Sequence, residues 1–159
     1  MEQYILYLAL KEIVNSLNNN FKCSFNDMDS NKDNVVGIYI KGAEPSTYRT
    51  LKDGKYYNTI NRVQFLIQGG LDNNSLLNCL NLSTMIKESL PTTYNLYKNV
   101  AVKERDSKIL NINIKDNNVV NLLIIKIDLM SDIISLGKSE QGRPRYSINF
   151  KVTYNLGGN

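Results

Sequence analysis

The sequence contains no histidine and no tryptophan, and it has only two cysteines and three prolines among its 159 residues. Histidine is the commonest general base and metal ligand near neutral pH, so its absence removes the usual partner of a nucleophilic serine or cysteine. The segment Gly69-Gly70-Leu71-Asp72 lacks the lysine and the glycine spacing of a phosphate-binding loop. The composition therefore predicts a protein that is not an enzyme and that holds no metal or cofactor.

Long hydrophobic runs are also missing. The most apolar stretches, 4–10 and 119–130, are too short or too interrupted for the roughly 20 residues of a membrane-spanning helix. No basic segment precedes the first apolar run, as it would in a secretory signal, so we expect Cys23 and Cys79 to be reduced thiols. The 19 basic residues outnumber the 15 acidic ones but form no run, which is a poor electrostatic footprint for nucleic acid.

The length fits one compact domain, which we expect over residues 1–159. Leucine and isoleucine recur at helical spacing near the N-terminus and predict a helix over 2–18. Asn73 or Asn74 starts a second predicted helix that ends before Pro91. The inward stripes predicted for the two helices are Leu6, Leu10, Ile13 and Leu17 in the first, and Leu76, Cys79, Leu80, Ile86 and Leu90 in the second.

Alternating apolar and polar residues predict strands at 21–25, 35–41, 61–68 and 146–154, the first two joined as a hairpin. The almost continuous apolar segment 119–128 predicts a strand covered on both faces. The remaining segments are predicted to be a long connection over 42–59, a short strand at 110–114, a helical turn at 132–136 and a polar loop at 137–144. The expected fold class is α+β, a mostly antiparallel β-sheet with two main helices packed on one face.

Two groups of acidic residues are candidates for catalysis or metal binding. Asp128 and Asp132 are four residues apart, but we expect a solvated turn and a helix cap rather than an acid–base pair. The segment 27–33 places oxygen ligands at alternate positions, like the start of a calcium loop. Lys32 and Ile38 stand where such a loop needs glycine and a bidentate glutamate, so an acidic turn is the expected structure.

Aromatic and basic residues interleave in the segment 48–57. Such a segment can bind single-stranded nucleic acid through stacking and phosphate contacts. It can also anchor a protein interface, where tyrosine and arginine are enriched, and the lack of any further basic groove favours this second role. A second candidate contact is the polar loop before the last strand. The candidate interface residues are Tyr48, Arg49, Lys52, Lys55, Tyr56, Lys138, Arg143 and Arg145.

The C-terminal segment from Leu136 to Tyr154 carries a G-x-x-x-x-G-R loop followed by a Y-S-x-N-F-x-V-x-Y strand. This pattern resembles the closing hairpin of the minor capsid and tail terminator (tail completion) proteins of tailed bacteriophages. The strand ending in Gln68-Gly69-Gly70 with the helix after it, and the N-terminal amphipathic helix, are similar to the corresponding parts of that family. The resemblance leaves 42–59 and 91–118 unmatched.

The resemblance implies a structural protein of a phage or phage-tail-like particle. Proteins of this kind form a homo-hexameric ring at the head-proximal end of the tail tube, stop its polymerisation and meet the head or its connector. The implied partners are other copies of the chain, the tube protein and the connector or neck proteins, with a sheath as a further candidate. DNA only passes through the lumen, and the implied location is the virion, assembled in the bacterial cytoplasm. The alternatives are a head-completion or neck protein at the same junction and, from another class, a small nucleic-acid-binding module using the 48–57 segment.

Overall fold

The computed structural model describes residues 2–50, 56–91, 96–102 and 118–156. In these ranges two helices pack against one six-stranded, mostly antiparallel sheet, which confirms the predicted α+β class. No helix in them is both long and apolar enough to cross a bilayer. The elements in chain order are α1 (Glu2–Leu17), β1 (Lys22–Phe25), β2 (Val35–Thr50), β3 (Tyr56–Gln68), α2 (Ser75–Ser89), β4 (Leu96–Val102), β5 (Asn118–Lys138) and β6 (Pro144–Leu156).

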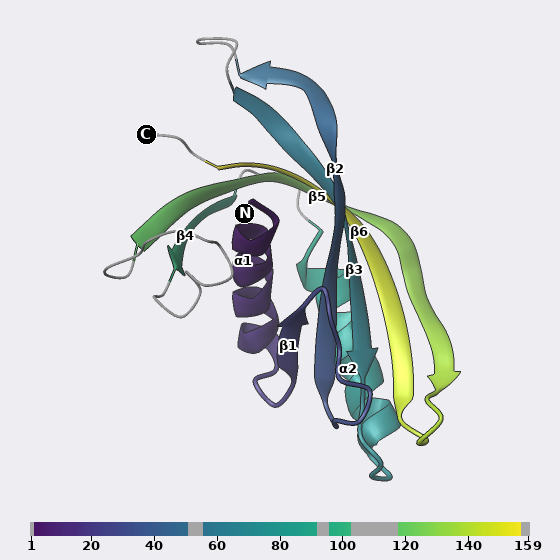
Figure 1. Ribbon diagram of the computed structural model, residues 1–159. Helices are drawn as coiled ribbons and strands as arrows, with labels where there is room; N and C mark the ends of the chain where they lie inside the picture. The colour runs from purple at the N-terminus through teal and green to yellow at the C-terminus, as the bar shows by residue number, and fades with distance from the viewer. Residues whose placement is uncertain (1, 51–55, 92–95, 103–117, 157–159) are drawn as a thin grey trace.

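The sheet has the strand order β1-β2-β3-β6-β5-β4 and is strongly curved, with α1 inside the curve (Figure 1). The long strands β3 and β6 form its centre and pair from Thr59 with Tyr154 to Gln68 with Arg145. At the upper end of Figure 1, the end of β2 and the start of β3 diverge from β5 and β6 and project from the rest of the sheet. Two well-separated ends of the sheet are therefore available for contacts.

The core lies between the helices and the inward face of the sheet. The predicted alternation in β3 and β6 is confirmed, because the apolar residues of both strands are buried on this face. Phe65 and Phe150 meet there edge to face, with ring centroids 5.6 Å apart. The predicted N-terminal helix is also confirmed, and both helices contribute to the same core as the strands. The helix residues in this core include Leu6, Leu10, Val14, Cys79, Leu82, Ile86 and Leu90.

The strands predicted at 21–25 and 35–41 exist, but the prediction that they form a hairpin is wrong. β1 and β2 run parallel, with Lys22 opposite Val35 and Phe25 opposite Ile38. β1 is only about 13 Å long, so the short segment 26–34 is enough to return the chain to the end where β1 began. Asn26 adopts a left-handed backbone conformation at the start of the return, and its side chain accepts a 2.7 Å hydrogen bond from the Ile40 amide.

The prediction of a long connection over 42–59 is wrong as well. β2 continues to Thr50 and pairs with β3, with Glu44 opposite Ile60 and Thr50 opposite Tyr56. Register shifts lie between Lys41 and Glu44 and between Pro45 and Arg49. Irregular pairing of this kind accommodates proline in a strand and disturbs the alternation by which a strand is recognised in sequence.

The second helix is confirmed, with Asn74 at the N-cap position, although the Asn74 side chain makes no capping hydrogen bond. Its predicted inward stripe is only partly right. Cys79, Ile86 and Leu90 are buried, whereas Leu76 is 51% exposed and Leu80 is 37% exposed. Leucines surround the first half of this helix, so their spacing does not fix which side faces the core. The inward side includes Leu82 and Ser83 instead.

β5 confirms the predicted strand at 119–128 and continues to Lys138, so the helical turn predicted at 132–136 is wrong. In that stretch Ile134 lies opposite Ser147 and Ser135 opposite Tyr146. The expected cover on both faces is also wrong, since Leu122, Ile124 and Ile127 are buried while the intervening residues are partly or fully exposed. Register shifts along β5 interrupt its alternation and explain the misassignment. The strand predicted at 110–114 lies outside the described residues.

Candidate subunit interface

The loop between β5 and β6, residues 139–143, is held in shape by its own hydrogen bonds. The Ser139 amide donates to the Arg143 carbonyl at 2.7 Å, and the Ser139 hydroxyl oxygen accepts from the Arg143 amide at 3.1 Å. Gly137, two residues before this loop, and Gly142 within it have φ angles of +73° and +89°, a region that disfavours other residues. The predicted polar loop is therefore a rigid hairpin turn with Lys138 exposed at its start.

Arg143 is 8% exposed and points back into its own chain rather than outward. Its Nε donates a 2.8 Å hydrogen bond to Asp33 Oδ1, and one of its terminal nitrogens donates to the Gln141 side-chain oxygen. The Gln141 amide in turn donates to the Asn31 side chain. Arg143 thus ties the 139–143 loop to the 26–34 loop, so its guanidinium is already engaged inside the subunit.

Arg145 lies beside this network and is half-buried. Its Nε donates at 2.8 Å to Oε1 of Gln68, a fully buried side chain at the end of β3. The Gln68 amide nitrogen lies 2.7 Å from the Lys32 carbonyl oxygen and 3.3 Å from those of Asp29 and Ser30. Gln68 therefore holds the 26–34 loop against the end of β3 and also orients Arg145.

A shallow polar hollow of about 280 Å³ opens between these two loops, lined by Ser30, Ser139, Glu140, Gln141 and Arg145. It contains one carboxylate and one guanidinium, so it has no marked preference for ligands of either charge. Its geometry suits a polar protein contact better than a small-molecule site, because ligand pockets are mostly apolar. Arg145 and Lys138 remain the predicted interface residues of this region that face solvent.

The other predicted contact region lies at the opposite end of the sheet (Figure 1). Tyr48 and Arg49 belong to the end of β2 and Tyr56 begins β3, with Arg49 opposite Tyr57. Lys52 and Lys55 lie outside the described residues. The described residues on both sides of 51–55 are therefore the ends of two paired strands. The structure does not bring it together with the 138–145 region, because Gln68 beside Arg145 is at the far end of β3 from Tyr56.

Exposed apolar side chains gather on α2 and on the second half of β5, and the sequence reasoning missed them. The two elements meet where Lys87 of α2 pairs with Asp132 of β5 at 2.6 Å. The exposure of these leucines could be recognised only once the inward side of α2 was known. We define the α2–β5 surface by the exposed residues Leu71, which precedes α2, Leu76, Leu77, Leu80 and Met85 of α2, and Leu129 of β5, which lies opposite Phe150 on the face of the sheet that α2 covers.

The acidic residues Asp128 and Asp132 each pair with a lysine. Asp128 pairs with Lys126 at 3.3 Å, and the hydrogen bond from Lys87 lowers the pKa of Asp132. In the 27–33 segment, Asp29 accepts a hydrogen bond from the Asn31 amide, as in an acidic turn. Within the described ranges, no group of three or more cysteine, aspartate or glutamate side chains has the arrangement of a metal site.

Cys23 and Cys79 are free thiols, as predicted. Burial raises the pKa of Cys23 to about 11, while the charge of Lys11 acts in the opposite direction. Burial raises the pKa of Cys79 to about 12, against the opposing hydrogen bond from the Gly69 backbone. Both thiols are therefore protonated near neutral pH, and neither has the lowered pKa of a catalytic nucleophile.

Comparisons with models of protein families and with curated proteins found no match.

Proposed function

We propose that this chain is a structural subunit of a phage or phage-tail-like particle that assembles into a ring on the head-proximal end of the tail tube. In this role it stops tube polymerisation and forms the junction to the head or its connector. The C-terminal hairpin pattern supports this proposal, and the observed α+β fold is compatible with it. Because one fold serves many functions, the function has to be inferred from the residues on the surface.

The observation that carries the proposal is the α2–β5 surface. Monomeric soluble proteins rarely leave neighbouring large apolar side chains exposed, and such surfaces mark protein contacts. Here Leu71 and Leu77 are each 58% exposed and Leu76 is 51% exposed. Burying these side chains against another subunit would contribute about 25 cal/mol per Å² of apolar area removed from water.

The sheet adds a second feature that suits a ring. β4 pairs with β5 only over Asn118–Ile124. From Ile125 to Lys138, β5 therefore pairs with β6 on one side and with no described strand on the other. The strand at the other edge, β1, is short and different in sequence. Two unlike edges favour a head-to-tail contact, and head-to-tail contacts close into rings when the rotation between subunits allows it.

Lys138 and Arg145 stand beside this surface, at the end of the β5–β6 hairpin. We propose them as polar contacts at its rim, where charged side chains are ordinarily found in interfaces. Arg143 serves the same contact indirectly, by holding the loop that presents its neighbours. The end of β2 and the start of β3, with Tyr48, Arg49 and Tyr56, would reach a different partner, such as the tube or the connector.

The test replaces two exposed leucines of α2 by charge, in the variant Leu76→Glu with Leu77→Glu. The matched control is Val119→Glu, which changes a residue of 62% exposure near the start of β5. Each protein is co-expressed with the tube protein of its own genome, and tail lengths are measured in electron micrographs. We expect the wild type and the control to give tails of uniform length, and the double variant to give overlong tails while its circular dichroism stays unchanged.

Two outcomes contradict the proposal. Uniform tails capped by the double variant would show that the α2–β5 surface is not the functional contact. Uniform tails formed without this protein, accompanied by heads that fail to join them, would favour the neck-protein alternative instead.

A further inference from the structure

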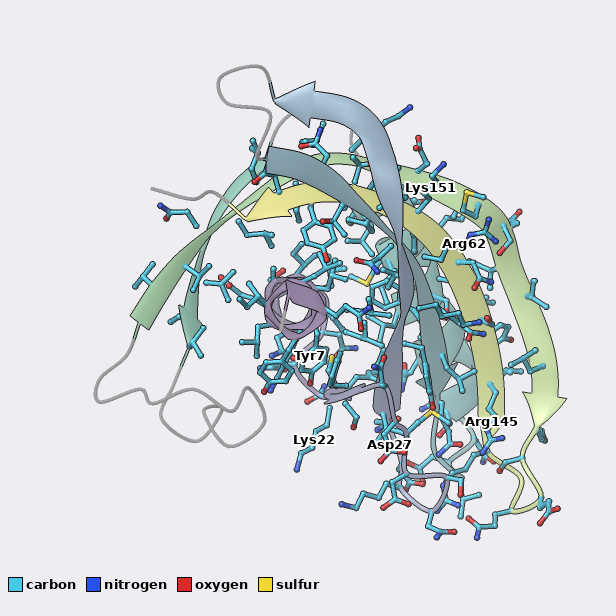
Figure 2. The ribbon with its side chains drawn as sticks, turned by 45° about the horizontal axis from the view of Figure 1, so that its top comes forward. Tyr7, Lys22, Asp27, Arg62, Arg145 and Lys151 are labelled. Atoms are coloured by element: carbon cyan, nitrogen blue, oxygen red, sulfur yellow. The ribbon has the colours of Figure 1, made fainter. Side chains whose placement is uncertain are left out.

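Three basic residues lie side by side across the outer face of the sheet. Lys41 of β2 is opposite Arg62 of β3, and Arg62 is opposite Lys151 of β6. Their chain neighbours Ile40, Val63 and Val152 are buried in the core, so the three basic side chains point away from the helices. Figure 2 shows Arg62 and Lys151 on this outer side, away from α1. We call Lys41, Arg62 and Lys151 the basic row.

The basic row is costly for the isolated subunit. Like charges directly opposite each other on neighbouring strands destabilise a sheet. The next residue across, Asp128 of β5, lies opposite Lys151 but forms its ion pair with Lys126, at 3.3 Å. Among the described residues, no carboxylate lies within ion-pair distance of Lys41 or Lys151. The charges of Lys41 and Lys151 therefore favour a negatively charged partner at this face.

Two hollows flank the basic row on the same face. One, of about 410 Å³, lies toward the ends of β2 and β3 that adjoin the 51–55 segment. Its lining residues are Asn58, Ile60, Ile125, Lys126, Asp128, Lys151 and Thr153, so it includes the Lys126–Asp128 ion pair. The other, of about 200 Å³, lies toward the opposite end and is lined by Gln64, Met130 and Asn149 together with Lys41 and Arg62. The basic row thus lies between Ile60 and Ile125 of one hollow and Met130 of the other, an arrangement that would complement carboxylates flanked by apolar side chains.

We propose that the basic row and its two hollows form a docking site for an acidic segment of another protein, in which glutamate or aspartate alternates with aliphatic residues. The carboxylates would lie on Lys41, Arg62 and Lys151, and the aliphatic side chains would enter the hollows. The site is on a different face from the α2–β5 surface, so the inference does not depend on the proposed ring.

A nucleic acid fits this face less well. Sheet surfaces that bind single strands offer exposed aromatic rings on which bases stack. Among the described side chains that line the two hollows, the one aromatic ring is that of Phe150, which is 1% exposed and is not accessible to a base. These features favour an acidic protein segment.

The test uses three fluorescent probes of equal length: a peptide of alternating glutamate and leucine, the same peptide with glutamine for glutamate, and a thymidine oligonucleotide. Binding is measured by anisotropy at low ionic strength, where charge contacts are least screened. The site variant is Lys41→Glu with Lys151→Glu, which relieves the repulsion in the row and should therefore fold. The control, Lys22→Glu with Lys32→Glu, changes the net charge equally at exposed positions of other parts of the surface.

We expect the glutamate–leucine peptide to bind the wild type, and the site variant to weaken that binding by at least about tenfold, which corresponds to 1.4 kcal/mol. The control should stay within about twofold, a change of about 0.4 kcal/mol. The glutamine peptide should bind at least about tenfold more weakly than the glutamate peptide. Failure of the glutamate–leucine peptide to bind, or equal loss in site variant and control, would overturn the proposal. So would tighter binding of the oligonucleotide that the site variant abolishes, since the row would then be a phosphate site.

Discussion

Arg143 Nε donates a 2.8 Å hydrogen bond to Asp33 Oδ1, and this one contact joins two loops whose residues are 110 positions apart in the chain. The arginine side chain is 10% exposed, whereas the carboxylate is 53% exposed. The arginine end of this hydrogen bond is therefore shielded from water, whereas the carboxylate end is open to it. It fixes the β5–β6 turn to the return segment between β1 and β2, and it explains why Arg143 is an internal residue of the proposed interface region.

We predict that Arg143→Ala lowers the free energy of unfolding by about 1–2 kcal/mol, because a charged hydrogen bond and the packing of a buried side chain are both lost. Lys138→Ala, an exposed change in the same hairpin, should stay within about 0.5 kcal/mol. Urea unfolding measures both. In a double-mutant cycle with Asp33→Asn, the loss of stability in the double mutant should be smaller than the sum of the losses in the two single mutants. Full additivity would show that the two side chains do not act as a pair.

Two glycines of β2 should respond in opposite ways to the same substitution. A Cβ at Gly37 would lie 2.9 Å from the Asp27 carbonyl oxygen and 2.6 Å from the Tyr39 ring, whereas one at Gly42 would meet nothing within 4 Å. We expect Gly37→Ala to cost about 1–3 kcal/mol, because the return segment has to move away. Gly42→Ala should be neutral or stabilising by up to about 1 kcal/mol, since alanine reduces the freedom of the unfolded chain. Equal melting temperatures for the two variants would contradict this close approach.

Asn61 is a fully buried polar side chain at the centre of the sheet. Its Oδ1 accepts a 2.6 Å hydrogen bond from the Tyr154 hydroxyl, and its Nδ2 donates at 2.8 Å to the Lys41 carbonyl. Asn61→Leu should lower the free energy of unfolding by about 2–4 kcal/mol, because it removes the buried hydrogen bonds to both Tyr154 and Lys41. Tyr154→Phe removes one hydroxyl and should cost about 1–2 kcal/mol. A smaller loss for Asn61→Leu than for Tyr154→Phe, measured by urea unfolding, would be inconsistent with this arrangement.

The buried thiol of Cys79 should make stability fall at alkaline pH. Burial raises its pKa from 9.0 to about 12, so above pH 9.0 the unfolded chain releases this proton while the folded chain keeps it. The stabilising contribution is complete below pH 9.0 and is lost as the pH rises toward 12. We therefore expect the stability advantage of the wild type over Cys79→Ala to shrink by up to about 1.4 kcal/mol per pH unit in this window.

Urea unfolding of both proteins at about pH 8 and pH 10 checks this prediction, since the two conditions lie on either side of the ordinary thiol pKa. An advantage that does not change with pH would mean that the folded thiol ionises like an exposed one.

The sequence by itself determined where most elements lie. Regular alternation marked the strands around Val63, Phe65 and Ile67 and from Tyr146 to Tyr154, because each of these strands buries one face. Leucine and isoleucine spacing marked α1 and α2, and Asn74 with Pro91 marked the limits of the second helix. These patterns are local, so they can be recognised in the sequence without knowing what the element packs against.

Tertiary structure alone decided how the elements meet. Nothing local sets β1 parallel to β2, because that pairing depends on the core beneath both strands and on the return through Asn26. The bulged parts of β2 and β5 are strands only because a partner strand supplies their hydrogen bonds, which is why 42–59 and 132–136 were misassigned. The sites follow the same division. The sequence predicts an outward contact for Arg143, whereas the fold places Asp33 beside it. Lys41, Arg62 and Lys151 form one surface only through the register of three strands.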